Sequence, residues 1–133
     1  ANDGILMKPY IFDYSMTKSG KIKVKTLPDY EKPYFDETLS NKLKEMMIGV
    51  VNKGTATRLI TDDLIVGGKT GTAENETDIA HSWFIGFAQD KDSRYSSIAF
   101  AIIVENGEKG AYAQTVARKI INTYKQVSYE DMN

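Results

Sequence analysis

The stretch that decides the fold is LIVGGKTGTAE, at residues 64–74. An apolar run that leads into glycines is typical of a β-strand. Because side chains alternate along a strand, Thr70 and Thr72 are expected on one face, where both hydroxyls can donate to one carboxylate. Gly71 lets a ligand backbone lie close, and Lys69 favours an anion and can hydrogen-bond a neighbouring hydroxyl. At a sheet edge, such a strand could also pair with an extended peptide.

Two other interpretations of residues 64–74 must be weighed. A phosphate-binding loop is one, since Gly68, Lys69 and Thr70 match the end of the G-x-x-x-x-G-K-[ST] pattern. The first glycine of that pattern would fall at Asp63, and the chain after Lys69 does not continue as helix sequence. We therefore reject the phosphate loop. An ordinary glycine-flanked strand is the other reading, which the tripeptide alone would not exclude.

The rest of the chain predicts an α+β fold around this strand. Apolar periodicity and turn signals predict the following elements: an antiparallel sheet with strands at about 64–74, 81–89 and 96–106, helices at about 36–53 and 111–125, and an N-terminal hairpin at about 10–26. A loop through Pro28 and Pro33 precedes the first helix, for which Asp36 is the expected N-cap and Gly54 the stop. In the last helix, Val116, Ile120, Ile121 and Tyr124 form the expected apolar face.

Segments spread along the chain resemble, in order, the C-terminal part of the transpeptidase domain of class B-like penicillin-binding proteins. Besides the Lys-Thr-Gly strand, the similar segments are residues 1–10, 46–56, 83–87, 99–105 and 113–124. The resemblance implies the β-lactamase/transpeptidase-like fold, with residues 1–133 forming a single unit that is a C-terminal fragment of that domain. No initiator methionine, signal peptide or membrane-spanning run is present in the sequence, which fits this expectation.

The resemblance also implies a chemistry, which is serine acyl transfer from the D-alanyl-D-alanine end of a peptidoglycan stem peptide, with β-lactams as ligands of the same site. By this resemblance Lys69 would assist proton transfer, while Thr70, Gly71 and Thr72 would bind substrate through the donor carboxylate. The backbone N–H of Thr72 would form half of the oxyanion hole, and losing one such donor typically costs about a hundredfold to a thousandfold in turnover.

The nucleophile of such an enzyme is not credible in this chain. The pattern S-x-x-K occurs once, at Ser15 to Lys18, but its flanks alternate like strands around a Ser-Gly turn signal. Only fifty residues separate Lys18 from Lys69, too few for the helical subdomain that the family places between these motifs. No Ser-x-Asn sequence occurs either. We therefore expect the isolated chain to be inactive, with the acylated serine elsewhere in the parent protein.

Composition limits the cofactors and partners. A formal net charge of −1 gives no electrostatic case for nucleic acid, and the absence of cysteine excludes disulfides and thiolate metal sites. We expect no cofactor and no metal, and a surface or structural role for the single histidine, His81. The resemblance implies a parent protein anchored at the extracytoplasmic face of the bacterial membrane, whose remaining transpeptidase domain is a partner of this chain.

Other functions of the same superfamily remain open from sequence. They are a β-lactam sensor domain, a β-lactamase or D,D-carboxypeptidase, and a binding module without catalysis. A further expectation is that the isolated chain self-associates through residues 98–104 or covers them with the hairpin at 10–26, because residues 98–104 are apolar throughout. In the intact family domain this strand lies mid-sheet, so its outer edge would lose its partner in the isolated chain.

Overall fold

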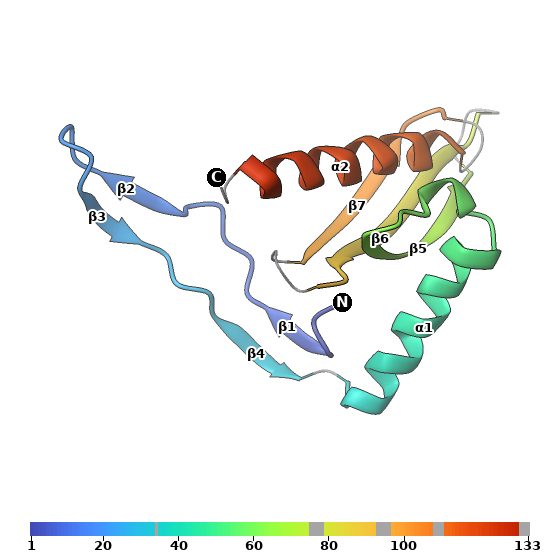
Figure 1. Ribbon diagram of the computed structural model, residues 1–133, viewed down its shortest axis with the longest axis horizontal. Coiled ribbons are helices and arrows are strands. Elements are labelled where there is room, and N and C mark those ends of the chain that lie inside the picture. Colours follow the sequence, from blue (N-terminus) through green and yellow to red (C-terminus); the bar gives the residue numbers. More distant parts are fainter. Residues whose placement is uncertain (34, 75–78, 93–96, 108–110, 131–133) are drawn as a thin grey trace. The chain divides into compact units, whose positions relative to one another are not determined.

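The computed structural model describes residues 1–33, 35–74, 79–92, 97–107 and 111–130 (Figure 1). Its elements are β1 (Ile5–Met7), β2 (Tyr14–Met16), β3 (Ile22–Lys25), β4 (Tyr30–Pro33), α1 (Glu37–Lys53), the 3-10 helix η1 (Thr57–Leu59), β5 (Leu64–Ala73), β6 (His81–Asp90), β7 (Ile98–Val104) and α2 (Ala111–Glu130). Two compact units make up the chain: residues 2–41 form one, and Ala1 with residues 42–133 forms the other.

The N-terminal unit is built on two short antiparallel pairs, β1 with β4 and β2 with β3. Strand β4 occupies part of the loop that we predicted through Pro28 and Pro33, so that prediction holds at Pro28 and is wrong for Tyr30–Pro33. Met7 lies opposite Tyr30, and next to this pair the Lys8 Nζ donates to the Asp29 carboxylate at 2.5 Å. This hydrogen bond, with the Lys8 charge, holds the pKa of Asp29 below its ordinary value.

The predicted hairpin at 10–26 is present, with its paired strands confined to β2 and β3. Its turn is closed by the Thr17 N–H, which donates to the Lys21 carbonyl at 2.8 Å, and by Gly20, whose φ is +82°. Ser15 lies in β2 opposite Val24. The S-x-x-K pattern therefore spans a strand and a turn, and it lacks the helix that would bring its lysine to its serine.

Helix α1 begins and ends at the residues that the sequence indicated. The Asp36 carboxylate accepts the Leu39 N–H at 2.7 Å, which confirms the N-cap. At the other end, the N–H groups of Gly54 and Ala56 donate to the Val50 carbonyl at 3.2 and 3.1 Å. Gly54 is required by close packing, since a Cβ there would lie 2.9 Å from the Val50 Cα and carbonyl oxygen.

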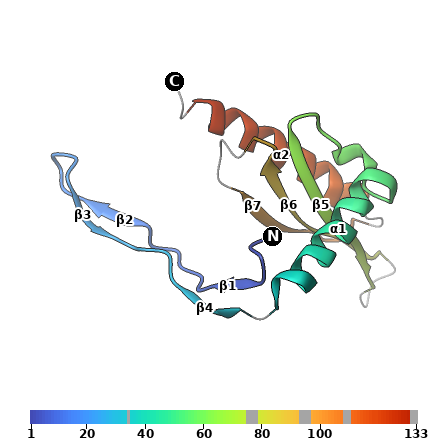
Figure 2. The same ribbon diagram turned by 60° about the horizontal axis from the view of Figure 1, so that its bottom comes forward.

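The C-terminal unit is organised by an antiparallel sheet of strand order β5-β6-β7, with α2 packed on β6 and β7 (Figures 1 and 2). All three strands were predicted, with ends within two residues of those observed. The pairing runs without a bulge from Leu64 opposite Asp90 to Ala73 opposite His81. The buried core comprises Val51, Ala56, Leu59, Leu64, Val66, Phe84, Ala88, Ile102, Ala113, Ala117 and Ile121.

Helix α2 is longer than predicted, and it buries most of the apolar face that the sequence indicated. It extends to Glu130, five residues beyond the predicted end. Of the predicted face, Ile121 is buried, Ile120 and Tyr124 pack against the core, and Val116 is 37% exposed. Two small residues, Ala113 and Ala117, are also fully buried. Within the described residues, no helix is both long and apolar enough to cross a lipid bilayer.

Strand β7 is an edge strand whose only partner among the described strands is β6. All seven of its residues are apolar, and its register with β6 is continuous. Proteins usually protect such an edge with charges, proline or a bulge. None of these features interrupts β7, and no described strand pairs with its outer edge.

We expect the isolated chain to self-associate through β7, and Ala101→Lys to weaken that association. Ala101 is exposed at the centre of the strand, where a lysine opposes edge-to-edge pairing. Sedimentation velocity at several concentrations should show association for the unmodified chain and a shift toward monomer for Ala101→Lys. Asn41→Lys makes the same charge change at an exposed position of α1 and should leave association unchanged. A monomer at every concentration would contradict this prediction.

Candidate active site

The Lys-Thr-Gly-Thr sequence occupies the second half of β5, which is the other edge of the sheet. In the described part of the chain β5 pairs with β6 alone, so one row of its backbone groups has no strand partner. This is the condition under which we expected the strand to accept an extended peptide. The register places Lys69 opposite Ile85 and Thr72 opposite Ser82.

The register also separates the motif between the two faces of the sheet. Thr70 lies opposite Phe84, which is buried in the core that α2 covers, and Thr72 lies opposite the buried Ser82. The two threonines therefore share one face, as the alternation predicted. Lys69 and Gly71 lie on the other face, together with exposed Trp83 and Ile85.

Lys69 is exposed, and its Nζ donates to the Thr70 carbonyl oxygen at 2.7 Å. The sequence suggested a hydrogen bond to a neighbouring hydroxyl, whereas this acceptor is a backbone oxygen. The ammonium group is thus held close to the strand. It carries three donors, so one bond to the backbone leaves capacity for an anionic or hydroxyl group.

Glycines allow aromatic rings to lie directly against the part of β5 that precedes the Lys-Thr-Gly-Thr sequence. A Cβ on Gly68 would come within 2.2 Å of the Phe84 Cζ, and one on Gly67 within 2.5 Å of the Phe87 Cζ. At Gly71 a Cβ would lie 3.2 Å from the Trp83 Cβ, which is tighter than an ordinary van der Waals contact. These glycines bring the strand close to β6 side chains and fix its position.

Thr55 is a residue near the motif that sequence reasoning missed. Its Oγ1 lies 3.1 Å from the Thr70 Oγ1, a hydrogen bond in which either hydroxyl can donate. Thr55 follows the stop of α1 and precedes Ala56, which is fully buried. The only sequence signal was the Gly-Thr-Ala turn itself, and nothing in the spacing indicates that this turn reaches Thr70.

The first two residues of β6, which lie beside Thr72, anchor this strand through their side chains. The His81 Nδ1 accepts the Asn106 N–H at 3.0 Å, which gives His81 the structural role that we expected. The next residue, Ser82, is fully buried, and its Oγ accepts the Ala113 N–H of α2 at 3.1 Å. These bonds tie β6 to the turn after β7 and to the first turn of α2.

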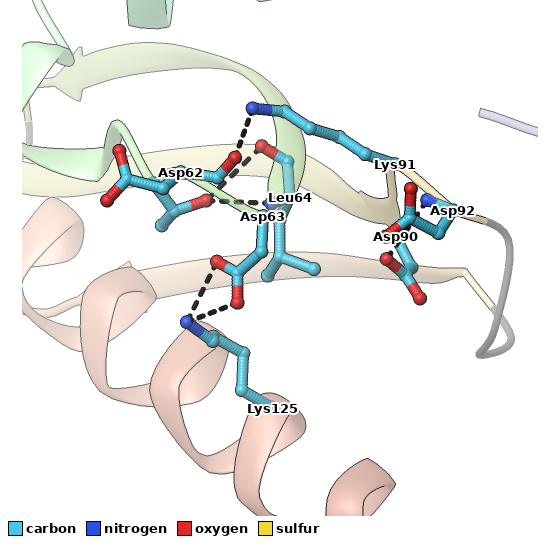
Figure 3. Close-up of polar contacts among 8 residues, drawn as sticks. Asp62, Asp63, Leu64, Asp90, Lys91, Asp92 and Lys125 are labelled. Atoms are coloured by element: carbon cyan, nitrogen blue, oxygen red, sulfur yellow. Dashed lines mark hydrogen bonds and ion pairs between the residues drawn. The ribbon is translucent and has the colours of Figure 1, made fainter.

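The start of β5 is fixed by an ion pair and by backbone hydrogen bonds (Figure 3). The Lys125 Nζ lies 2.8 Å from Asp63 Oδ1 and 2.7 Å from Asp63 Oδ2, so α2 holds the residue that precedes the strand. The Lys91 Nζ donates to the Asp62 carbonyl oxygen, and the Lys91 N–H donates to the Asp63 carbonyl at 3.1 Å. The strand that carries the motif is therefore anchored before it begins.

No group of three or more histidine, cysteine or acidic side chains suited to a metal ion occurs among the residues that the structure describes. Ser15 belongs to the N-terminal unit, whereas the motif of β5 belongs to the C-terminal unit. The β5 edge brings together two threonine hydroxyls, one ammonium group and backbone N–H groups, which are donors of the kind that suit an anionic ligand.

Comparison with known proteins supplies the class. A family model described as the penicillin binding protein transpeptidase domain matches residues 1–123. The peptidoglycan D,D-transpeptidase PbpA of Mycobacterium tuberculosis is 30% identical over 137 residues, covering 95% of this chain and 27% of that protein. PbpA of Mycolicibacterium smegmatis is 29% identical over 91% of this chain and 26% of its own length.

Solved structures agree with these relatives. The D,D-transpeptidase domain of a peptidoglycan glycosyltransferase from Eggerthella lenta superposes with a TM-score of 0.80 and 31% identity, over 96% of this chain and 29% of that one. The imipenem acyl-enzyme complex of penicillin-binding protein A from M. tuberculosis superposes with a TM-score of 0.76 and 29% identity, over 91% of this chain and 27% of that one.

The chain belongs to the penicillin-binding protein transpeptidase domain family. Its α+β architecture is that of these transpeptidase domains, as the sequence predicted. It spans between a quarter and a third of the length of these relatives, as the coverages of 26% and 29% show.

The contact beneath Gly68 can be tested with a pair of alanine substitutions. Gly68→Ala should destabilise the protein by about 1–3 kcal/mol, because Phe84 must move away from the new methyl group. Gly49→Ala is the matched control, since a Cβ at this α1 position meets nothing within 4 Å and alanine favours helix by up to about 1 kcal/mol. Urea unfolding measures both changes, and equal stability of the two variants would contradict the packing described here.

Proposed function

We propose that this chain forms one wall of the active site of a peptidoglycan D,D-transpeptidase, which binds β-lactams at the same place. The observation that carries the proposal is the β5 edge, where residues 69–72 stand beside backbone groups that have no strand partner among the residues that the structure describes. The relatives add support, because PbpA of M. tuberculosis is a D,D-transpeptidase by name and penicillin-binding protein A forms an acyl-enzyme with imipenem.

In this proposal the two threonine hydroxyls bind the terminal carboxylate of the donor stem peptide. Thr70 and Thr72 lie on one face of the strand, so both can reach the same anion. Gly71 adds no side chain between them, and a substrate backbone can pair with the strand edge. A β-lactam would place its own carboxylate at the same hydroxyls.

The backbone N–H of Thr72 is proposed to donate to the developing oxyanion, with the second donor supplied by the residue that carries the nucleophile. A serine outside this chain would attack the carbonyl carbon of the penultimate D-alanine and release the terminal D-alanine. An amine of a second stem peptide would then attack the acyl-serine and free the serine hydroxyl. Lys69 would assist the proton transfers of both steps.

The proposed substrate sets the proposed location and partners. Peptidoglycan is assembled outside the cytoplasmic membrane, so the parent protein would act at the extracytoplasmic face, anchored by a segment outside this chain. The stem peptide is the proposed ligand, and the rest of the parent transpeptidase domain is the proposed partner. A sensor or a hydrolase of the same superfamily would share this β5 edge, but would differ in the fate of the acyl-serine.

The first expected outcome is that this chain alone forms no covalent adduct with β-lactams. Positioning groups without a nucleophile give little covalent chemistry, and Ser15 lies on a strand rather than on a helix with its lysine. Incubation with a fluorescent penicillin, followed by intact-mass measurement, checks this, with the full-length parent as positive control. A stoichiometric adduct on Ser15 would refute it.

The second outcome concerns Thr72 in the full-length parent. Thr72→Val keeps the backbone N–H but removes the hydroxyl, and a hydrogen bond to a charged partner is worth about 1.5–3 kcal/mol. The acylation rate should therefore fall by about tenfold to a hundredfold. Thr72→Ser should restore most of the rate, and Thr115→Val, the same change at an exposed position of α2, should leave it unchanged. Equal rates for Thr72→Val and Thr115→Val would remove Thr72 from the site.

A further inference from the structure

We propose that Thr55 is a positioning residue that orients the Thr70 hydroxyl toward the carboxylate of the ligand. The inference rests on the proposed function and adds to it a residue outside the Lys-Thr-Gly-Thr sequence. Its basis is the 3.1 Å hydrogen bond between the Thr55 Oγ1 and the Thr70 Oγ1. Thr70 is half-buried and Thr72 is exposed, so the two threonines proposed to bind the carboxylate stand in different surroundings.

The turn that carries Thr55 is held on both sides. Before it, the Gly54 N–H donates to the Val50 carbonyl, and after it the Ala56 N–H donates to the same oxygen. Ala56 is fully buried, and its carbonyl accepts the Leu59 N–H at 3.0 Å. The backbone of Thr55 therefore has little freedom, and a β-branched side chain is stiff at χ1. Its hydroxyl is thus presented to Thr70 by a fixed support.

The hydroxyl chemistry gives this contact a direction when an anion is bound. Each hydroxyl has one proton to donate and two lone pairs that accept. A carboxylate only accepts, so the Thr70 proton must point toward the ligand. The Thr55 proton must then point toward the Thr70 oxygen. The result is a chain in which Thr55 donates to Thr70 and Thr70 donates to the carboxylate, and such chains strengthen their members cooperatively.

This arrangement makes the effect of Thr55 specific for the charge of the ligand. If the carboxylate is converted to a methyl ester, the acceptor loses its charge. The hydrogen bond that Thr70 donates to it is then weaker, and its alignment by Thr55 has little effect on the acylation rate. A residue that only supported the fold would affect both ligands equally. The ratio of the acylation rates for the free acid and the methyl ester therefore separates positioning from a purely structural role.

The test uses the full-length parent and a fluorescent penicillin, offered as the free acid and as its methyl ester. Thr55→Val should lower the second-order acylation rate with the free acid by about twofold to tenfold, the value of one neutral hydrogen bond. The rate with the methyl ester should change little. Thr55→Ser should restore the free-acid rate. Thr57→Val, the same substitution at an exposed position two residues on, should have no effect.

A double-substitution cycle completes the test. If Thr55 acts through Thr70, Thr55→Val combined with Thr70→Val should be no slower than Thr70→Val alone. A free-acid rate unchanged by Thr55→Val, fully additive effects in the cycle, or an equal loss with the methyl ester would each overturn the inference. Because the two ligands are compared on one folded protein, a change in stability does not obscure the result. A wild-type rate for Thr70→Val would instead refute the proposed carboxylate site.

Discussion

The contact between the glycines of β5 and the aromatic rings of β6 is the constraint on which the C-terminal unit depends. Gly67 and Gly68 lie against Phe87 and Phe84, and the alternation of the strand puts these two rings on opposite faces of the sheet. No larger residue fits at either position without moving a buried ring. Both phenylalanines are almost fully buried, so the strand is held between them.

This constraint determines the register of β5 on β6 and therefore the faces on which the motif residues lie. A shift by one residue would exchange the face of the threonines with that of Lys69. The Thr70 hydroxyl would then leave Thr55, and the ammonium group of Lys69 would face the core side of the sheet. The Asp63–Lys125 ion pair and the Ser82–Ala113 hydrogen bond add to the same register, because they fix the start of β5 and the opposite end of the sheet.

The sequence was sufficient to predict the elements whose periodicity is local. The three strands of the C-terminal sheet, the capped start of α1 at Asp36 and the turn at Gly20 all follow from patterns within a few residues. The β1–β4 pair could not be predicted, since its strands are short and Pro28 and Pro33 signalled a loop. The contact between Thr55 and Thr70 was also beyond reach, because it depends on how a turn packs against a strand. The roles assigned to the motif itself stay predictions.

The single tryptophan gives the chain a natural spectroscopic probe. Trp83 lies opposite Gly71 on β5 and opposite Ile103 on β7, on the central strand of the sheet. It is 38% exposed, so its indole senses both solvent and neighbouring groups. Intrinsic fluorescence therefore reports from one position on the face that carries Lys69. Quenching by a neutral solute such as acrylamide could follow the covering of that face, without a label and without a second emitting tryptophan.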